Sequence, residues 1–160
     1  MAEELKAGER VFLVVVDESP ELAKALRYAS RRAKRTGGRV AMLYVMEPPE
    51  SQQWGGVAEL MRQEARQQAE EIIARYAEIA ASLTGQPPAI HIREGKSRDE
   101  LLKLITEDRS ISVLVLGSSE SGEGPGPLVT ALTGKLGSQL RIPLTIVPGG
   151  LTEAEIDAIS

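Results

Sequence analysis

Five short runs rich in apolar residues are separated along the chain by stretches with helical periodicity. The runs read VFLVVV (11–16), VAMLYVM (40–46), AIHIR (89–93), ISVLVLG (111–117) and PLTIVP (143–148). Continuous apolar, β-branched runs are typical of strands that are covered on both faces of a sheet. The pattern therefore predicts five strands, most of them fully buried.

The segments between these strands are predicted to be helices. The first follows the first strand, with Ser19 as its N-cap and Pro20 at its first position, and it ends at TGG (36–38). The second is a long helix over about 57–83. Its apolar residues recur at helical spacing: Met61, Ala65, Ala69, Ile72, Tyr76, Ala80 and Leu83.

The later helices carry their own start signals. Ser97 and Glu100 have the spacing of a capping box for a third helix, and a fourth helix is predicted over about 127–140. In the tail LTEAEIDAIS, Thr152 and Glu155 have the same capping-box spacing. We expect a short helix there, stapled by Leu151 and Ile156, that covers a sheet edge or a partner subunit; a frayed terminus is the alternative.

Strands that alternate with helices imply right-handed crossovers and a mainly parallel sheet with helices on both faces. The fold class is therefore α/β, a single doubly wound domain. In such sheets ligands bind outside the carboxyl ends of the strands, where the winding direction reverses. This rule directs attention to Asp17, at the end of the first strand, and to the loop that follows the fourth strand.

That loop lies within VLVLGSSESGEGPGPLVTALTGK (113–135), which passes from strand to Gly-rich loop to helix. This order is typical of a phosphate cradle, but the loop carries Glu120 and Glu123 and has no basic residue before Lys135. Neither G-x-G-x-x-G nor G-x-x-x-x-G-K-[ST] is present. The alternative is a plain connection whose glycines and prolines keep the helix from extending backward. The segment GSSES also departs from a hydrolase nucleophile elbow, because Ser121 stands where that motif has glycine.

Three single residues have both functional and structural interpretations. Asp17 can accept hydrogen bonds from a nucleoside or from the backbone at the start of the first helix. His91, the only histidine, is expected on the face opposite Ile90 and Ile92 and is interpreted as structural. Trp54 is interpreted as packing against its own domain, with a lid or an interface anchor as the alternative.

Charge and composition argue against several classes of partner and location. The chain has 19 basic and 23 acidic residues, and its dense basic run (31–35) ends a predicted helix, where cations complement the dipole. We therefore expect no nucleic-acid partner. The chain has no cysteine, its first residues do not resemble a signal peptide, and no apolar run approaches the roughly 18 residues of a membrane span. We expect a cytoplasmic protein with no membrane partner.

The motifs together resemble the universal stress protein family. The resemblance rests on VFLVVVDESPELAKALRYA, VAMLYVMEP, IREGKSRDELLKLI, VLVLGSS and IPLTIVPG, in this order. It implies an adenine-nucleotide α-hydrolase-like fold with strand order 3-2-1-4-5 and a homodimer formed through the fifth strand (143–148). It divides the chain into an N-terminal extension (1–9), the family domain (10–149) and a tail (150–160).

The resemblance also implies a nucleotide site. ATP-binding members of the family carry G-x-x-G, nine residues, then G-[ST]; counted from Gly117, this pattern falls on Glu120, Thr130 and Ala131, so only its first position matches. Asp17 matches the family aspartate that holds adenosine. The set of residues matched to the nucleotide site is Val15, Val16, Asp17, Val45, Leu116, Gly117, Glu120, Thr130, Ala131, Leu132 and Thr133.

Two hypotheses follow. In the first, the protein is a non-enzymatic, homodimeric regulator with a regulatory protein partner, and Glu120 weakens or abolishes ATP binding. A carboxylate about 4 Å from a phosphate oxygen would cost about 4 kcal/mol at an effective dielectric of 20. In the second, Gly122, Gly124 and Gly126 re-form the cradle, and the protein binds ATP or another adenine nucleotide with Mg and turns it over slowly; Gly124 and Gly134 reproduce the nine-residue interval.

Overall fold

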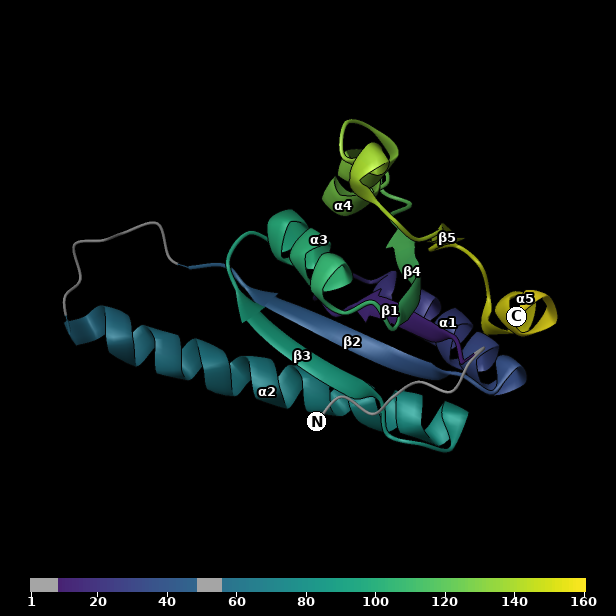
Figure 1. Ribbon diagram of the computed structural model, residues 1–160, viewed down its shortest axis with the longest axis horizontal. Helices are drawn as coiled ribbons and strands as arrows, with labels where there is room; N and C mark the ends of the chain where they lie inside the picture. Colours follow the sequence, from purple (N-terminus) through teal and green to yellow (C-terminus); the bar gives the residue numbers. More distant parts are fainter. Residues whose placement is uncertain (1–8, 49–55) are drawn as a thin grey trace.

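The computed structural model describes residues 9–48 and 56–160. They form one five-stranded sheet in which every pair of neighbouring strands is parallel, in the order β3-β2-β1-β4-β5 (Figure 1). The predicted α/β fold and strand order are thus confirmed. The predictions for Trp54 and for most of the N-terminal extension lie outside the described residues. The strands are β1 (Val11–Val15), β2 (Arg39–Met46), β3 (Ala89–Glu94), β4 (Ile111–Ser118) and β5 (Leu144–Pro148).

Helices cover both faces of the sheet. One face packs against α1 (Leu22–Thr36), α2 (Gly56–Thr84) and α5 (Glu153–Ile159), and the other against α3 (Ser97–Glu107) and α4 (Pro127–Thr133). The alternating side chains of β1 divide between the two apolar layers, as expected for a strand buried on both faces. Among the described residues, none of the helices has the length and hydropathy that crossing a bilayer requires.

The long helix α2 buries only part of its predicted apolar stripe. Ala69, Ile72 and Ala80 are buried against the sheet and α1, whereas Met61 is 42% exposed. Figure 1 shows why: the N-terminal part of α2 runs past the end of the sheet. Helical periodicity therefore predicted the helix correctly but not how far the sheet beneath it extends.

Two predicted helix starts are wrong in detail. α1 begins at Leu22 rather than after Ser19, and Ser19 donates its backbone N–H and its hydroxyl to Asp17 instead of capping the helix. α3 has no side-chain cap. The Glu100 Oε2 atom lies 4.0 Å from the Arg93 Nη1 atom, and the Ser97 hydroxyl donates a hydrogen bond to the Glu47 Oε1 atom at 3.4 Å. Charged partners outside α3 thus replace the predicted capping box.

The predicted helix over 127–140 is interrupted. α4 ends at Thr133, and a separate 3₁₀ turn, η1 (Gly137–Gln139), follows it. Gly134 is the C-cap of α4 and Gly137 begins η1, and added Cβ atoms at these two positions would approach backbone carbonyl oxygens at 3.0 and 2.8 Å. Glycine has a low helix propensity, so the two glycines favour this break.

The C-terminal tail forms the predicted helix. Thr152 and Glu155 make the reciprocal capping box, and the Ile156 side chain is fully buried. Helix α5 packs on α1 rather than fraying, and Asp157 accepts hydrogen bonds from the Arg27 Nε and Nη2 atoms at 2.7 and 2.8 Å. The hydrogen bond from Arg27 holds the pKa of Asp157 below its ordinary value. The tail is therefore an integrated part of the domain.

Candidate functional site

Three adjoining hollows lie at the carboxyl edge of the sheet, where the parallel-sheet rule places ligands. The switch-point hollow, of about 50 Å³, lies between the ends of β1 and β4. The large cleft, of about 610 Å³, extends from β1 across β2 to the start of α3, and the glycine-loop hollow, of about 640 Å³, lies between the β4–α4 loop and α3. Pro127 at the start of α4 borders all three, so they form one continuous region.

The large cleft has an apolar floor and a polar rim. The ends of β1 and β2 supply Val15, Val16 and Val45, and α4 closes the far side with Leu128 and Ala131. The polar and charged residues around it are Asp17, Glu18, Tyr44, Glu47, Lys96, Ser97 and Arg98. An apolar floor with a few convergent polar groups is typical of a site for a small organic ligand.

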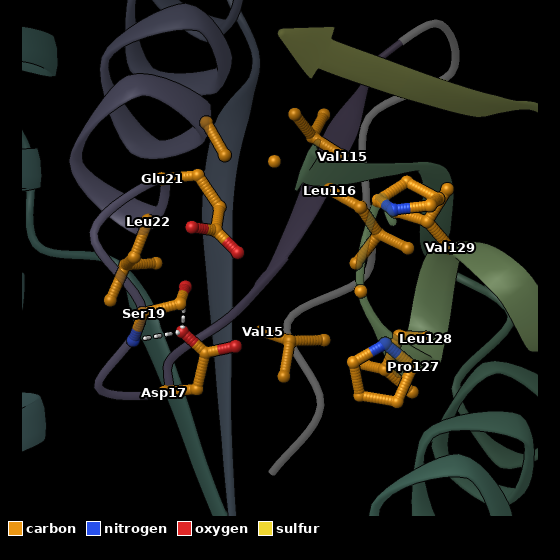
Figure 2. A pocket seen from close by; sticks show the side chains of 14 residues that line it. Val15, Asp17, Ser19, Glu21, Leu22, Val115, Leu116, Pro127, Leu128 and Val129 are labelled. Atoms are coloured by element: carbon orange, nitrogen blue, oxygen red, sulfur yellow. Dashed lines mark hydrogen bonds between the residues drawn. The ribbon is translucent and has the colours of Figure 1, made fainter. Parts of the chain in front are cut away.

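Asp17 is an exposed residue held by a local turn. Its Oδ1 atom accepts hydrogen bonds from the Ser19 backbone N–H, at 3.0 Å, and from the Ser19 hydroxyl (Figure 2). Among the described residues, every hydrogen bond to this carboxylate uses Oδ1. The Oδ2 atom is therefore available to accept a hydrogen bond from a ligand hydroxyl or amino group.

Tyr44 lines the same large cleft as Asp17 and lies near the Glu18 carboxylate. Burial, followed by the nearby Glu18 carboxylate, raises the pKa of the Tyr44 hydroxyl above its ordinary value. The hydroxyl therefore stays protonated at neutral pH and can donate a hydrogen bond as well as accept one. Its half-buried ring contributes apolar surface to the same cleft.

The β4–α4 loop has the conformation that its glycines permit. Gly124 and Gly126 adopt φ values of +104° and +112°, which side-chain-bearing residues rarely adopt. The loop is closed by a hydrogen bond from the Ser119 N–H to the Pro125 carbonyl oxygen at 2.9 Å. Ser121 and these glycines of the loop, together with Thr130 of α4, line the glycine-loop hollow.

The charged residues of the glycine-loop hollow are two carboxylates and one guanidinium. Glu21, from the turn before α1, and Glu123, from the loop, supply the carboxylates, and Arg98 from the first turn of α3 supplies the cation. The side chains that line this hollow therefore carry a net negative charge. An anionic ligand would gain from one of these groups and be repelled by the other two.

Glu21 also forms one wall of the switch-point hollow. Figure 2 shows its carboxylate and Asp17 on one side and Leu116, Leu128 and Val129 on the other. The end of β4 packs closely on this wall, because a Cβ on Gly117 would lie 2.6 Å from the Glu21 carbonyl oxygen. Only glycine fits at position 117 without displacing the segment that carries Glu21.

The Glu120 side chain lies away from these hollows. A Cβ on Gly150 would overlap the Glu120 carboxylate, and one on Gly149 would lie 3.8 Å from the Glu120 Cγ. The carboxylate is thus directed at the backbone after β5, and Glu120 is not among the lining residues of any of the three hollows. The predicted repulsion between Glu120 and a phosphate is not supported by this placement; Glu21 and Glu123 lie where Glu120 was expected.

The other sequence-predicted residues fall into two groups. Leu116 and Gly117 line the switch-point hollow, and Thr130 and Ala131 line the glycine-loop hollow. In contrast, Leu132 is buried in the core and the Thr133 hydroxyl donates to the Val129 carbonyl oxygen at 2.6 Å. Gly134 follows the end of α4, so the interval from Gly124 to Gly134 does not place its second glycine at the start of that helix. Ligand binding by these residues stays a prediction.

His91 lies in edge strand β3, on the sheet face opposite Ile92. Its Nε2 atom is buried and has no hydrogen-bond partner in the described part of the chain, and burial lowers the pKa of the imidazole. His91 lines none of the three hollows. Within residues 9–48 and 56–160, no group of three or more histidine, aspartate or glutamate side chains is placed to hold a metal ion.

Sequence reasoning missed most of the polar rim. Lys96, Ser97 and Arg98 follow β3, whose carboxyl end lies at the same edge of the sheet as those of β1 and β4. The rule that ligands bind at the carboxyl ends of parallel strands applies to all five strands. Applied to β3, it would have directed attention to these residues from the sequence alone.

Comparisons with known proteins agree with this architecture. No curated protein sequence matches the chain. Among solved structures, the universal stress protein UspA from Lactobacillus plantarum is 16% identical to this chain, with a TM-score of 0.73. The match covers 89% of this chain and 99% of the UspA chain. The Archaeoglobus fulgidus universal stress protein in complex with dAMP is 16% identical with a TM-score of 0.59, covering 88% and 98%.

A universal stress protein in complex with cAMP is also similar, with 15% identity and a TM-score of 0.53 over 89% of this chain and 99% of its own. At these identities the likeness concerns the fold. The sequence itself carries the further evidence, since the profile of the universal stress protein family matches residues 9–148. The chain belongs to the universal stress protein family.

Proposed function

We propose that this protein is a non-enzymatic, homodimeric stress-response regulator whose large cleft binds an adenine nucleoside and whose glycine-loop hollow disfavours a triphosphate. The observation that carries the proposal is the contrast between the two hollows. The large cleft offers apolar and hydrogen-bonding surface, whereas the glycine-loop hollow presents two carboxylates against one guanidinium.

The large cleft suits a nucleoside in size and chemistry. Its volume of about 610 Å³ falls within the usual range for small-molecule sites. The valines of β1 and β2 can pack against a planar base, and the free Oδ2 atom of Asp17 can accept hydrogen bonds from ribose hydroxyls or an adenine amino group. The cAMP and dAMP complexes of proteins with this fold support an adenine-containing ligand.

The glycine-loop hollow suits a triphosphate poorly. ATP carries about four negative charges, and Glu21 and Glu123 would face them with only Arg98 in compensation. At about 4 Å each unfavourable pair of charges costs from roughly 1 kcal/mol in bulk water to about 4 kcal/mol near a protein surface. We therefore expect ATP to bind weakly or not at all, with a different cause from the one that the sequence suggested.

The chemistry of the lining residues supports a non-enzymatic role. The chain has no cysteine, and His91, its only histidine, lies in β3 outside the three hollows. Ser119, Ser121 and Thr130 line the glycine-loop hollow, and its lining includes no imidazole that could activate a hydroxyl. We expect no phosphate release from Mg-ATP above a protein-free control.

The proposed dimer forms through β5. This strand is at the edge of the sheet, and Ile146 is 37% exposed there. An apolar edge strand presents unpaired backbone groups to a second copy. Light scattering should give about twice the chain mass of 17.2 kDa, and Ile146→Lys should shift the equilibrium toward the monomer. A monomer at micromolar concentration in the unmodified protein would contradict this part of the proposal.

Calorimetric titration tests the nucleoside site directly. Adenosine should bind, and Asp17→Asn should weaken its binding, because the amide that replaces the carboxylate lacks the charge that strengthens these hydrogen bonds. Glu155→Gln, in the α5 capping box remote from the cleft, serves as the control. A dissociation constant for Mg-ATP in the low micromolar range or below, or the absence of adenosine binding, would overturn the proposal.

One observation favours the alternative of an ATP-binding member with slow turnover. Glu120 is directed at Gly149 and Gly150, which leaves the backbone of Gly124 and Gly126 open to the hollow. ATP found by mass spectrometry in the purified protein, together with phosphate release in the presence of Mg, would establish this alternative.

A further inference from the structure

Arg98 is the residue that connects the large cleft to the glycine-loop hollow. It lies in the first turn of α3 and lines both of them, together with Ala131 and Pro127 from α4. Of the three residues that line both hollows, Arg98 is the one that carries a charge, so a ligand that extends from the cleft toward the glycine loop comes close to this residue. Among the residues that line the glycine-loop hollow, Arg98 is the only cation.

The guanidinium is not committed to a strong partner within the protein. Its one ion pair in the described part of the chain is with Asp99, at 3.8 Å between Nε and Oδ1, and the two side chains are 57% and 61% exposed. An exposed pair at this distance contributes little free energy. Arg98 can therefore turn toward a ligand at small cost.

The charges in the glycine-loop hollow limit which ligand the Arg98 guanidinium can bind. One phosphate group can be paired with Arg98 by two parallel N–H···O bonds, the geometry that arginine favours. A second or third phosphate would extend along the loop, where Glu123 and Glu21 supply only negative charge. The hollow thus has the cation for one phosphate and repels a longer chain.

We propose that Arg98 is a specificity-determining residue that pairs with the single phosphate of an adenine nucleoside monophosphate whose base and ribose occupy the large cleft. The inference rests on the proposed nucleoside site and adds to it the class of ligand. Lys96 lines the cleft but not the glycine-loop hollow, so it does not supply the same contact.

Titrations of adenosine, AMP and ATP into four proteins test this assignment. The proteins are the unmodified chain, Arg98→Gln, Arg98→Lys and the control Lys103→Gln, which removes another exposed cation of α3 that pairs with Glu100 at 3.6 Å. In the unmodified protein AMP should bind about tenfold more tightly than adenosine, as expected for a charge-assisted hydrogen-bonded pair. ATP should bind more weakly than AMP.

The variants should separate the phosphate contact from the nucleoside site. Arg98→Gln should bring the affinity for AMP down to that for adenosine, Arg98→Lys should retain part of the tenfold advantage of AMP over adenosine, and Lys103→Gln should retain all of it. Equal affinity for AMP and adenosine in the unmodified protein, or an equal loss for both ligands in Arg98→Gln, would overturn the role of Arg98 while leaving the nucleoside site intact. Failure of adenosine and AMP to bind at all would overturn the proposed function as well.

Discussion

The attachment of α5 to the domain can be tested by Ile156→Ala. The Ile156 side chain has no exposed surface and belongs to the apolar layer formed with α1 and β5. Replacing a buried isoleucine with alanine typically costs about 2–5 kcal/mol. Because α5 is terminal, it can detach and forfeit only its own contacts, so we expect the lower part of this range, about 2–3 kcal/mol.

The expected loss translates into a measurable melting shift. Globular proteins unfold with about 2.1 cal/mol/K of entropy per residue, so for 160 residues each 1 kcal/mol lowers Tm by about 3 °C. Ile156→Ala should therefore melt about 6–9 °C below the unmodified protein by circular dichroism. Ile159→Ala is the matched control, because Ile159 is in the same helix but 60% exposed, and its effect should stay within about 0.5 kcal/mol.

Equal melting shifts for Ile156→Ala and Ile159→Ala would contradict a stabilising role for the burial of Ile156, since the two side chains would then contribute equally despite their different burial. Urea denaturation adds a second readout. A midpoint unchanged in Ile156→Ala would mean that α5 does not stabilise the folded domain.

Further predictions concern the site and the pH dependence of stability. Gly117→Ala should destabilise the protein by about 1–3 kcal/mol, because the added methyl overlaps the Glu21 backbone; an unchanged Tm would contradict this close packing. The double variant Glu21→Gln, Glu123→Gln should tighten ATP binding by about 30-fold, because each carboxylate removed from a solvated hollow contributes roughly 1 kcal/mol of repulsion. Glu120→Gln should leave ATP binding unchanged. Tighter ATP binding in Glu120→Gln, with no change in the double variant, would instead identify Glu120 as the repelling group. Burial lowers the pKa of His91 in the folded protein, so the stability of the protein should be fully present above pH 6.5 and should fall as the pH drops below this value. His91→Leu should therefore reduce the fall in Tm between pH 7 and 5.5. Identical pH profiles for the two proteins would exclude His91 as the cause.

The parallel sheet and its two apolar layers could be predicted because they depend on local patterns with strong physical causes, whereas the strand order was implied by the resemblance to the universal stress protein family. β-branched runs such as VFLVVV form strands that are buried on both faces, and alternation with helices fixes a parallel sheet. The capping box of Thr152 and Glu155 was predictable for the same reason, since both of its hydrogen bonds are formed within one helical turn.

Features that depend on long-range partners were not predictable in this way. Ser97 and Glu100 have the spacing of a capping box, yet the Ser97 hydroxyl donates to Glu47, which is 50 residues away in the chain. The direction of Glu120 depends on where the backbone after β5 lies, which the spacing between Gly117 and Thr130 does not specify. Arg98 joins the site only because β3 ends at the same edge of the sheet as β4.

A crystal structure of the protein with AMP would show directly whether a nucleoside monophosphate occupies the large cleft. We expect the base and ribose in the large cleft, with the ribose or the adenine amino group at Asp17, and the phosphate beside Arg98. An AMP molecule bound outside this cleft, or an ATP soak that reveals three ordered phosphates between Glu21 and Glu123, would contradict it.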